Sequence, residues 1–163
     1  MKPGVEVQSL RSALPQWLPA LRSYARALCR DRSAADDLVQ ETVLRALAAE
    51  AQWEDGTDLR AWLFTIQRNA WLGGLRRRGV EQRFLDQAAS EATVVQPDHG
   101  AVRDLQAAMM LLPAVQREAL TLVGGHGMSL AEAADVCGVA VGTIKARISR
   151  GRNALRALLS QQH

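Results

Sequence analysis

The segment 129–159 most constrains the fold, because it has the pattern of two helices joined by a tight turn. Ser129, followed three residues later by Glu132, predicts a capping box, in which each side chain satisfies a backbone donor at the helix start. Gly138 predicts a left-handed turn that ends this helix. A longer amphipathic helix follows, with Ile144 facing the first one. A helix-turn-helix requires a small residue, a glycine and a β-branched residue in this order, and Ala134, Gly138 and Ile144 meet this requirement. The inner face of the second helix is expected to hold Val141, Ile144, Ile148, Leu155 and Leu158.

The outer face of this second helix is predicted to carry hydroxyl and basic side chains. They are Thr143, Lys145, Arg147, Ser149, Arg150 and Arg152. From Thr143 to the C-terminus there are five basic residues and no acidic one. Solvated helices usually mix both signs of charge in i,i+4 pairs, whereas cations and short hydroxyls suit the phosphate-lined major groove of DNA. We therefore expect DNA contact here, with a solvated helix face as the alternative.

Length and charge favour two small modules. The 163 residues allow one ordinary domain or two small ones. The net charge is +3 over residues 1–79, −3 over residues 80–100 and +3 over residues 101–163. Two positive blocks around an acidic spacer suggest two modules that meet one polyanion.

The hydrophobic spacing upstream predicts three helices and no strand. Residues 1–12 are expected to be a frayed leader. The first helix is expected over 14–29, beginning at Pro15 or later. The second is expected over 34–49 and the third over 59–75. The expected caps of these last two helices are the turn Asp31 to Ser33, and Thr57 or Asp58.

The rest of the chain completes an all-α fold of two small helical domains. Residues 80–100 are rich in Gln, Ala, Ser and acids and predict a flexible linker. Two short helices are expected between residues 101 and 123, and the following glycine-rich stretch places His126 in a loop. The predicted domains are therefore 1–79 and 101–163, and the second is a four-helix domain that contains the helix-turn-helix.

Two polar surfaces of the first domain are candidate binding faces. The third helix and its end carry Arg60, Trp62, Gln67, Arg68, Asn69, Trp71, Arg76 and Arg77. Aromatic rings among arginines and amides suit unpaired bases, but Trp62 and Trp71 could equally be core residues. The second helix carries a polar stripe of Asp37, Gln40, Glu41 and Arg45. This stripe is either a solvated face or a docking surface for a protein.

Other function classes lack support. The two cysteines, Cys29 and Cys137, have no C-x-x-C or histidine partners and are expected to be small buried residues. The sequence has no apolar run of 18 residues and no signal-peptide core, so we expect a cytoplasmic protein without membrane insertion. It has no nucleophile–base pair, metal-ligand set or phosphate-binding glycine loop, so we expect no enzyme activity, cofactor or small-molecule substrate.

Four segments in order resemble the bacterial RNA polymerase sigma factors of the extracytoplasmic-function (group IV) type. They are DDLVQETVLRAL (36–47), LRAWLFTIQRNAWLGGLRRR (59–78), LLPAVQREALTL (111–122) and SLAEAADVCGVAVGTIKARISRGRNAL (129–155). The resemblance implies a transcription initiation factor that binds core RNA polymerase and recognises the −10 and −35 elements of promoter DNA. It also implies control by an anti-sigma factor.

The resemblance assigns a role to each candidate face. It implies that core polymerase is bound by Asp37, Gln40, Glu41 and Arg45. It implies that the −10 element is recognised by Trp53, Arg60, Trp62, Arg68, Asn69, Trp71, Arg76 and Arg77. It implies that the −35 element is recognised by Thr143, Lys145, Arg147, Ser149 and Arg150. The chain departs from the family at Gly73 and Gly74, where helix formers are usual, and at Ala146, where a small hydroxyl residue is frequent.

Two alternatives remain at this stage. A sigma-like decoy would bind an anti-sigma factor without binding DNA, but such mimics tend to lose the cations of the recognition helix, which are present here. An ordinary operator-binding regulator would explain the helix-turn-helix and leave residues 14–78 without a role.

Overall fold

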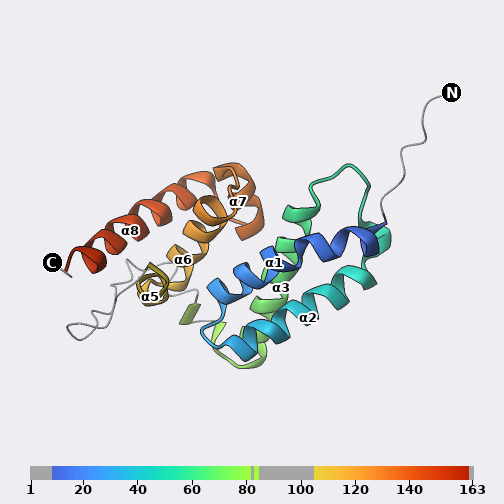
Figure 1. Cartoon of the computed structure of the whole chain (residues 1–163), viewed down its shortest axis with the longest axis horizontal. Coiled ribbons are helices and arrows are strands. Elements are labelled where there is room, and N and C mark those ends of the chain that lie inside the picture. Colours follow the sequence, from blue (N-terminus) through green and yellow to red (C-terminus); the bar gives the residue numbers. More distant parts are fainter. Residues whose placement is uncertain (1–8, 82, 85–104, 162–163) are drawn as a thin grey trace.

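The computed structural model describes residues 9–81, 83–84 and 105–161, and these residues form helices and no strand (Figure 1). The all-α expectation is confirmed. Most of the predicted linker, residues 85–100, lies outside the described residues. The elements are α1 Leu10–Leu28, α2 Arg32–Ala48, the 3₁₀ turn η1 Glu50–Gln52, α3 Leu59–Arg77, α5 Leu105–Leu111, α6 Ala114–Leu120, the π-type turn η2 Thr121–Gly125, α7 Leu130–Cys137 and α8 Val141–Ser160.

The predicted helix caps are present. The Asp31 carboxylate accepts from two backbone N–H groups at the start of α2, and the Asp58 carboxylate accepts from the Ala61 N–H at 3.2 Å at the start of α3. At α7 the capping box is complete. The Glu132 N–H donates to Ser129 Oγ at 3.0 Å, and the Ser129 N–H donates to Glu132 Oε2 at 3.3 Å. Short polar side chains therefore fix three helix starts.

The start of α1 differs from the expectation. The helix begins at Leu10 with Ser9 as its cap, and both Pro15 and Pro19 lie inside it. Burial explains the earlier start, because Leu10 is only 1% exposed and anchors the first turn in the core. Both prolines are exposed, so water can hydrate the carbonyl groups that lose a helical donor there.

Helices α1, α2 and α3 pack together around a core in which Leu21, Tyr24, Leu63 and Phe64 are fully buried. Helix α3 runs without a break through both of its glycines to Arg77. Chain packing continues past the predicted boundary at residue 79, because Phe84 is buried edge-on against Trp71, with ring centroids 4.8 Å apart. We call residues 9–84 the N-terminal unit.

Helices α5 to α8 form the C-terminal unit, residues 105–161, and its last two helices are the predicted helix-turn-helix. Gly138 adopts the left-handed conformation at the turn, with φ 65°, and Ile144 is fully buried, as expected. Val141 was expected on the inner face but is 38% exposed. It is the first residue of α8, and helical side chains point towards the N-terminus, so its side chain extends past the start of the helix.

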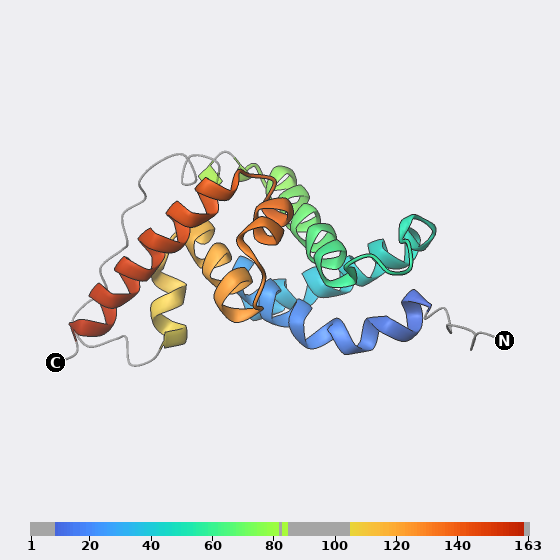
Figure 2. The same cartoon turned by 90° about the horizontal axis from the view of Figure 1, so that it is seen from above.

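The two units pack against each other (Figure 2). Helix α6 lies against α1, and α7 lies against α3. A single hydrophobic core runs through both units and includes Tyr24 and Phe64 from one and Leu122 and Ile144 from the other. We call this packing the closed arrangement. The sequence left the relative placement of the two units open, because hydrophobic periodicity shows only the faces that each helix buries within its own unit.

Candidate nucleic-acid interface

The first three turns of α8 carry exposed cationic side chains of the helix-turn-helix. Lys145, Ser149 and Arg150 are exposed and Thr143 is half-buried. Arg147 is only 8% exposed, so the expectation that it lies on the outer face of the helix is wrong. The spacing explains its position, because a residue three after the buried Ile144 lies near the same helix face.

A shallow hollow of about 460 Å³ lies between α8 and the residues Val123 and Leu130 of η2 and α7. Its polar lining is basic or neutral and is made of Lys145, Ser149, Arg152, Asn153 and Arg156. The N-terminal end of a helix also carries partial positive charge from its backbone dipoles. At its end near the start of α8, around Lys145 and Ser149, this surface can therefore bind phosphates and the acceptor-rich edges of bases in a major groove.

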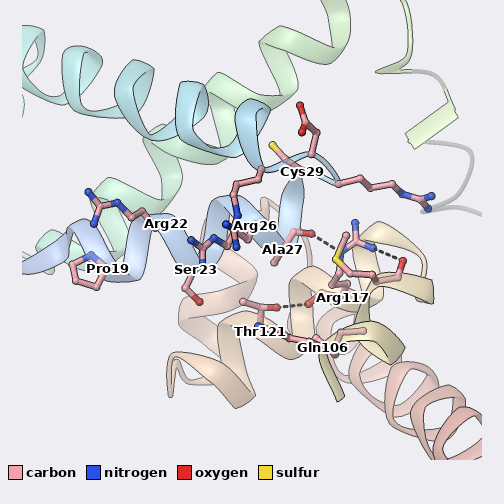
Figure 3. A pocket seen from close by; sticks show the side chains of 14 residues that line it. Pro19, Arg22, Ser23, Arg26, Ala27, Cys29, Gln106, Arg117 and Thr121 are labelled. Carbon is pink, nitrogen blue, oxygen red and sulfur yellow. Dashed lines mark hydrogen bonds between the residues drawn. The ribbon is translucent and has the colours of Figure 1, made fainter. Parts of the chain in front are cut away.

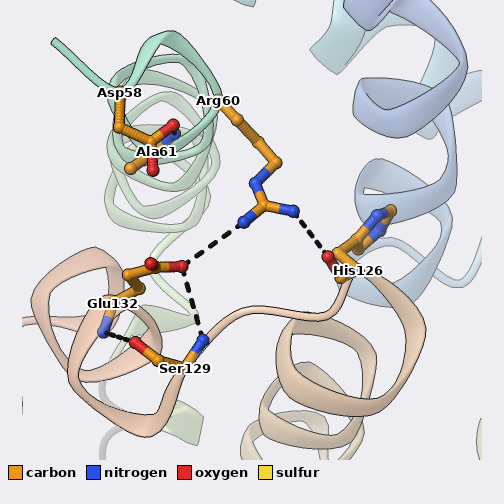
Figure 4. Close-up of polar contacts among 6 residues, drawn as sticks. All are labelled: Asp58, Arg60, Ala61, His126, Ser129 and Glu132. Carbon is orange, nitrogen blue, oxygen red and sulfur yellow. Dashed lines mark hydrogen bonds and ion pairs between the residues drawn. The ribbon is translucent and has the colours of Figure 1, made fainter.

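Two of the arginines predicted on the outer face of α3 contact the C-terminal unit in the closed arrangement. Arg60 Nη1 donates to the His126 carbonyl at 2.6 Å, and its Nη2 lies 3.3 Å from a carboxylate oxygen of Glu132 (Figure 4). Arg68 is 8% exposed, and its Nε donates to Glu118 Oε1 at 2.7 Å. Two of the predicted −10 residues therefore join the units in this structure.

The other predicted −10 residues have mixed positions. Trp71 is 7% exposed and packs on Phe84, which is a core position. Trp53 and Trp62 are half-buried. Three further residues are exposed at the C-terminal half of α3, namely Asn69, Arg76 and Arg77. The structure thus covers the middle of α3 and leaves its basic end exposed, where Arg76 pairs with Glu81 at 2.9 Å and Arg77 lies 3.8 Å from Glu41.

The polar stripe on α2 surrounds an apolar residue that the sequence reasoning missed. Asp37 and Gln40 are exposed, and Glu41 pairs with Arg45 at 2.7 Å. Leu44 is 67% exposed on the same helix, four residues after Gln40. An exposed leucine at this spacing inside the stripe was the available signal, because it breaks the pattern of a purely solvated face. An apolar side chain ringed by polar ones is typical of a protein-docking surface.

The loop between η2 and α7 holds a half-buried histidine, His126. The His126 ring packs edge-on against Phe64 with centroids 5.1 Å apart, and its Nε2 has no hydrogen-bond partner among the described residues. Burial lowers the pKa of His126 below its usual 6.5, and the Arg60 charge lowers it further. The imidazole is therefore held in its neutral form at neutral pH.

We expect the free energy of unfolding to fall as the pH drops from 7 to 5. The folded-state pKa lies below the unfolded one, so the unfolded chain takes up the proton first, and stability that is present above pH 6.5 is lost as the pH falls through the folded-state pKa. Urea denaturation at several pH values measures this decline. His126→Gln should make the decline shallower, and an unchanged decline would exclude His126 as its source.

A basic pocket of about 590 Å³ lies between the units, and α1 forms one wall while α5 and α6 form the other (Figure 3). Arg117 lies at its base, where the guanidinium donates to the carbonyls of Ala27 and Leu112 and so ties α6 to both units. Burial lowers the pKa of Arg117 to about 10, so it stays charged at neutral pH. Cys29 is half-buried in the same pocket, and Cys137 is buried in α7.

Comparisons with known proteins match both units. A family model described as the Sigma2 domain of PhyR matches residues 14–67. A second, described as Sigma-70, region 4, matches residues 103–155 and so includes the helix-turn-helix. No helix in the described part of the chain is long and apolar enough to cross a membrane.

Individual relatives extend the likeness over nearly the whole chain. The ECF RNA polymerase sigma factor EcfG of Rhodopseudomonas palustris is 45% identical over 154 residues, which cover 93% of this chain and 85% of that protein. The RNA polymerase sigma factor CarQ of Myxococcus xanthus is 31% identical over 151 residues, which cover 88% of this chain and 84% of that protein.

Solved structures share the fold over nearly the whole chain. The sigma factor RpoE of Bartonella quintana, crystallised with the anti-sigma factor NepR, matches with a TM-score of 0.75 and 40% identity over 96% of this chain and all of that one. CnrH in complex with the cytosolic domain of CnrY matches with a TM-score of 0.62 and 27% identity over 94% of this chain and 88% of that one.

Proposed function

This chain belongs to the extracytoplasmic-function family of RNA polymerase sigma factors, and from that membership we propose which of its surfaces performs each task. The protein is a transcription initiation factor, not an enzyme. It binds core RNA polymerase, directs it to promoters, and is regulated by an anti-sigma factor. We place its work in the cytoplasm, where the polymerase is found.

We assign recognition of the −35 element to the exposed basic face of α8. We propose that Lys145, Ser149 and Arg150 contact its bases and phosphates, with Thr143 at the edge of the face. Each is accessible on one side of the recognition helix, and no acidic residue follows Thr143 in the chain. Bidentate or charged contacts of this kind are worth about 1–3 kcal/mol each in discrimination between bases. A decoy that only binds an antagonist would have no use for this surface.

For the −10 element we propose the exposed basic end of α3 together with the loop before it. Asn69, Arg76 and Arg77 are accessible in the closed arrangement, and Trp53 and Trp62 are half-buried beside the same helix. Arg60, Arg68 and Trp71 would join this set when the C-terminal unit moves away from α3, because contacts with that unit hold both arginines.

The function is tested by reconstituted transcription. Purified core polymerase of the source bacterium, given this protein and a library of promoter fragments from the same genome, should start RNA at a limited set of sites. Core polymerase alone should not use these sites. If no fragment is transcribed while a known sigma factor restores activity to the same core preparation, the proposed function is wrong.

We propose that the stripe on α2 with Leu44 at its centre docks on core polymerase. Leu44→Asp should lower the affinity for core polymerase by about 10-fold or more, because burying a leucine contributes roughly 1.5–3 kcal/mol. Fluorescence anisotropy of labelled protein titrated with core polymerase measures this affinity. The matched control is Leu105→Asp, since Leu105 is a similarly exposed leucine of the other unit, at 58%. Equal losses from both variants would contradict a specific role for Leu44.

A further inference from the structure

A buried polar cluster joins the two units at the carboxylate of Glu118. This residue lies on α6 and is fully buried. Tyr24 donates its hydroxyl to Oε1 at 2.6 Å, and Arg68 Nε donates to the same oxygen at 2.7 Å. Both donors belong to the N-terminal unit. If the units separate, Glu118 loses both of these donors, while its contact with the Cys137 thiol lies within its own unit and remains.

Arg147 is a buried cation that interacts electrostatically with Glu118 but has few hydrogen-bond partners. It is 8% exposed, and its Nε and Nη1 donate to no acceptor among the described residues. The Cys137 thiol interacts electrostatically with Glu118 and with both arginines. Burial and the charge of Glu118 raise the pKa of its thiol, while Arg68 and Arg147 lower it. The cluster therefore buries two guanidinium groups around one carboxylate, and the second cation is not compensated.

The position of Arg147 in the C-terminal unit lets it pair with Glu118 without the N-terminal unit. Glu118 and Arg147 both belong to the C-terminal unit, on helices α6 and α8, which pack directly together. Their mutual distance therefore does not depend on the N-terminal unit. Arg68, in contrast, moves away with α3 whenever the units part.

We propose that Glu118 exchanges one arginine for the other: Arg68 holds it in the closed arrangement, and Arg147 takes its place when the units separate. The same carboxylate then fastens the closed arrangement and, after opening, anchors the recognition helix α8 from behind. Arg147 is in this view a positioning residue, which acts on DNA through the orientation of α8. The link to promoter binding rests on the proposed function, but the exchange itself does not.

If this exchange occurs, substitutions of Arg68 and Arg147 should shift the equilibrium between the open and closed arrangements in opposite directions. Arg68→Gln removes the partner that favours closing, so the ratio of open to closed protein should rise about tenfold or more. Arg147→Gln relieves an unpaired buried cation in the closed form and removes the replacement partner in the open form, so the ratio should fall by a similar factor. A merely structural Arg147 would instead loosen the C-terminal unit when it is removed.

Electron paramagnetic resonance distances in the full chain measure the equilibrium without polymerase or DNA. Spin labels go on the exposed positions Asp36 of α2 and Asn153 of α8, in a chain whose half-buried Cys29 is replaced by Ala. The parent for all variants also carries Arg60→Gln, because losing this second contact between the units raises the open population and makes a decrease measurable.

Two matched variants define the specificity of the effect. Arg152→Gln removes an exposed cation of the same helix and should leave the distance distribution unchanged. In a Glu118→Gln background, neither Arg68→Gln nor Arg147→Gln should shift the populations further, because the carboxylate that they share is gone. Arg147→Met, which keeps the length of the side chain, repeats the test in case the glutamine variant does not fold, as judged by circular dichroism.

A second measurement observes Arg147 directly. The Nε–Hε signal of Arg147 in nitrogen-15 spectra should move to a hydrogen-bonded position, with slower solvent exchange, in the Arg68→Gln variant. The proposal is overturned if Arg147→Gln and Arg147→Met leave the open fraction unchanged or raise it, or if the Nε–Hε signal does not respond. Because none of these readouts involves promoters, transcription can fail with the exchange intact, or succeed without it.

Discussion

Replacing Lys145 and Arg150 by glutamate should lower promoter-specific transcription at least about 100-fold. Each side chain is expected to contact DNA with a free energy of roughly 1–3 kcal/mol, and each glutamate adds repulsion from the phosphates. The fold should be unaffected, because both residues are exposed on α8. Run-off transcription with reconstituted holoenzyme measures the loss, and core binding, measured separately, should remain.

Arg156→Glu is the matched control for this pair. It reverses one exposed charge on the same helix, about three turns beyond Lys145. A surface cation away from the bases contributes only to the general electrostatic attraction, so its loss should lower transcription by less than about threefold at physiological salt. If Arg156→Glu were as damaging as the double variant, the reader of the −35 element would not be the start of α8.

The closed arrangement gives regulation a structural starting point. Arg60 and Arg68, both assigned to the −10 element, are engaged by Glu132, the His126 carbonyl and Glu118 of the other unit. The exposed face of α8, in contrast, is not covered by the N-terminal unit. Closing therefore restricts one of the two proposed promoter-binding surfaces more than the other. A partner that favours the closed arrangement would act mainly on −10 recognition.

The sequence predicted the elements well wherever a local rule decides the structure. Asp31, Asp58 and the Ser129–Glu132 pair cap helices as expected, because a cap depends on residues within one turn. Gly138 turns the chain for a similarly local reason. The start of α1 was misplaced because the burial of Leu10 outweighs the local preference of Pro15 to begin a helix.

Contacts between the units could not be predicted, because they depend on residues far apart in the sequence. Nothing near Glu118 indicates that Tyr24 and Arg68 will share its carboxylate, at separations of 94 and 50 residues. The burial of Arg147 was predictable in principle from its spacing to Ile144, yet its charge favoured a surface position. Buried polar residues at such joints are poorly marked by hydrophobic periodicity.

The role of Gly151 also follows only from the packing of the helices. It lies on α8 where that helix meets α6, and a Cβ atom at this position would come within 2.7 Å of Leu120 Cδ1, 3.3 Å of Leu120 Cγ and 3.5 Å of Gln116 Cβ. The nearest of these atoms is the end of a side chain, but the other two lie close to the backbone of α6. The absence of a side chain therefore sets how closely α8 approaches the rest of its unit.

Gly151→Leu should lower the free energy of unfolding by about 2–3 kcal/mol, because overpacking a well-filled contact forces the two helices apart. Gly142→Leu on the same helix is the control. No atom lies within 4 Å of its Cβ position, and replacing a helical glycine there should stabilise by up to about 1 kcal/mol. Urea denaturation followed by circular dichroism measures both. Equal stabilities for the two variants would mean that α8 can move off α6 freely, and the close contact at Gly151 would then not hold the recognition helix in place.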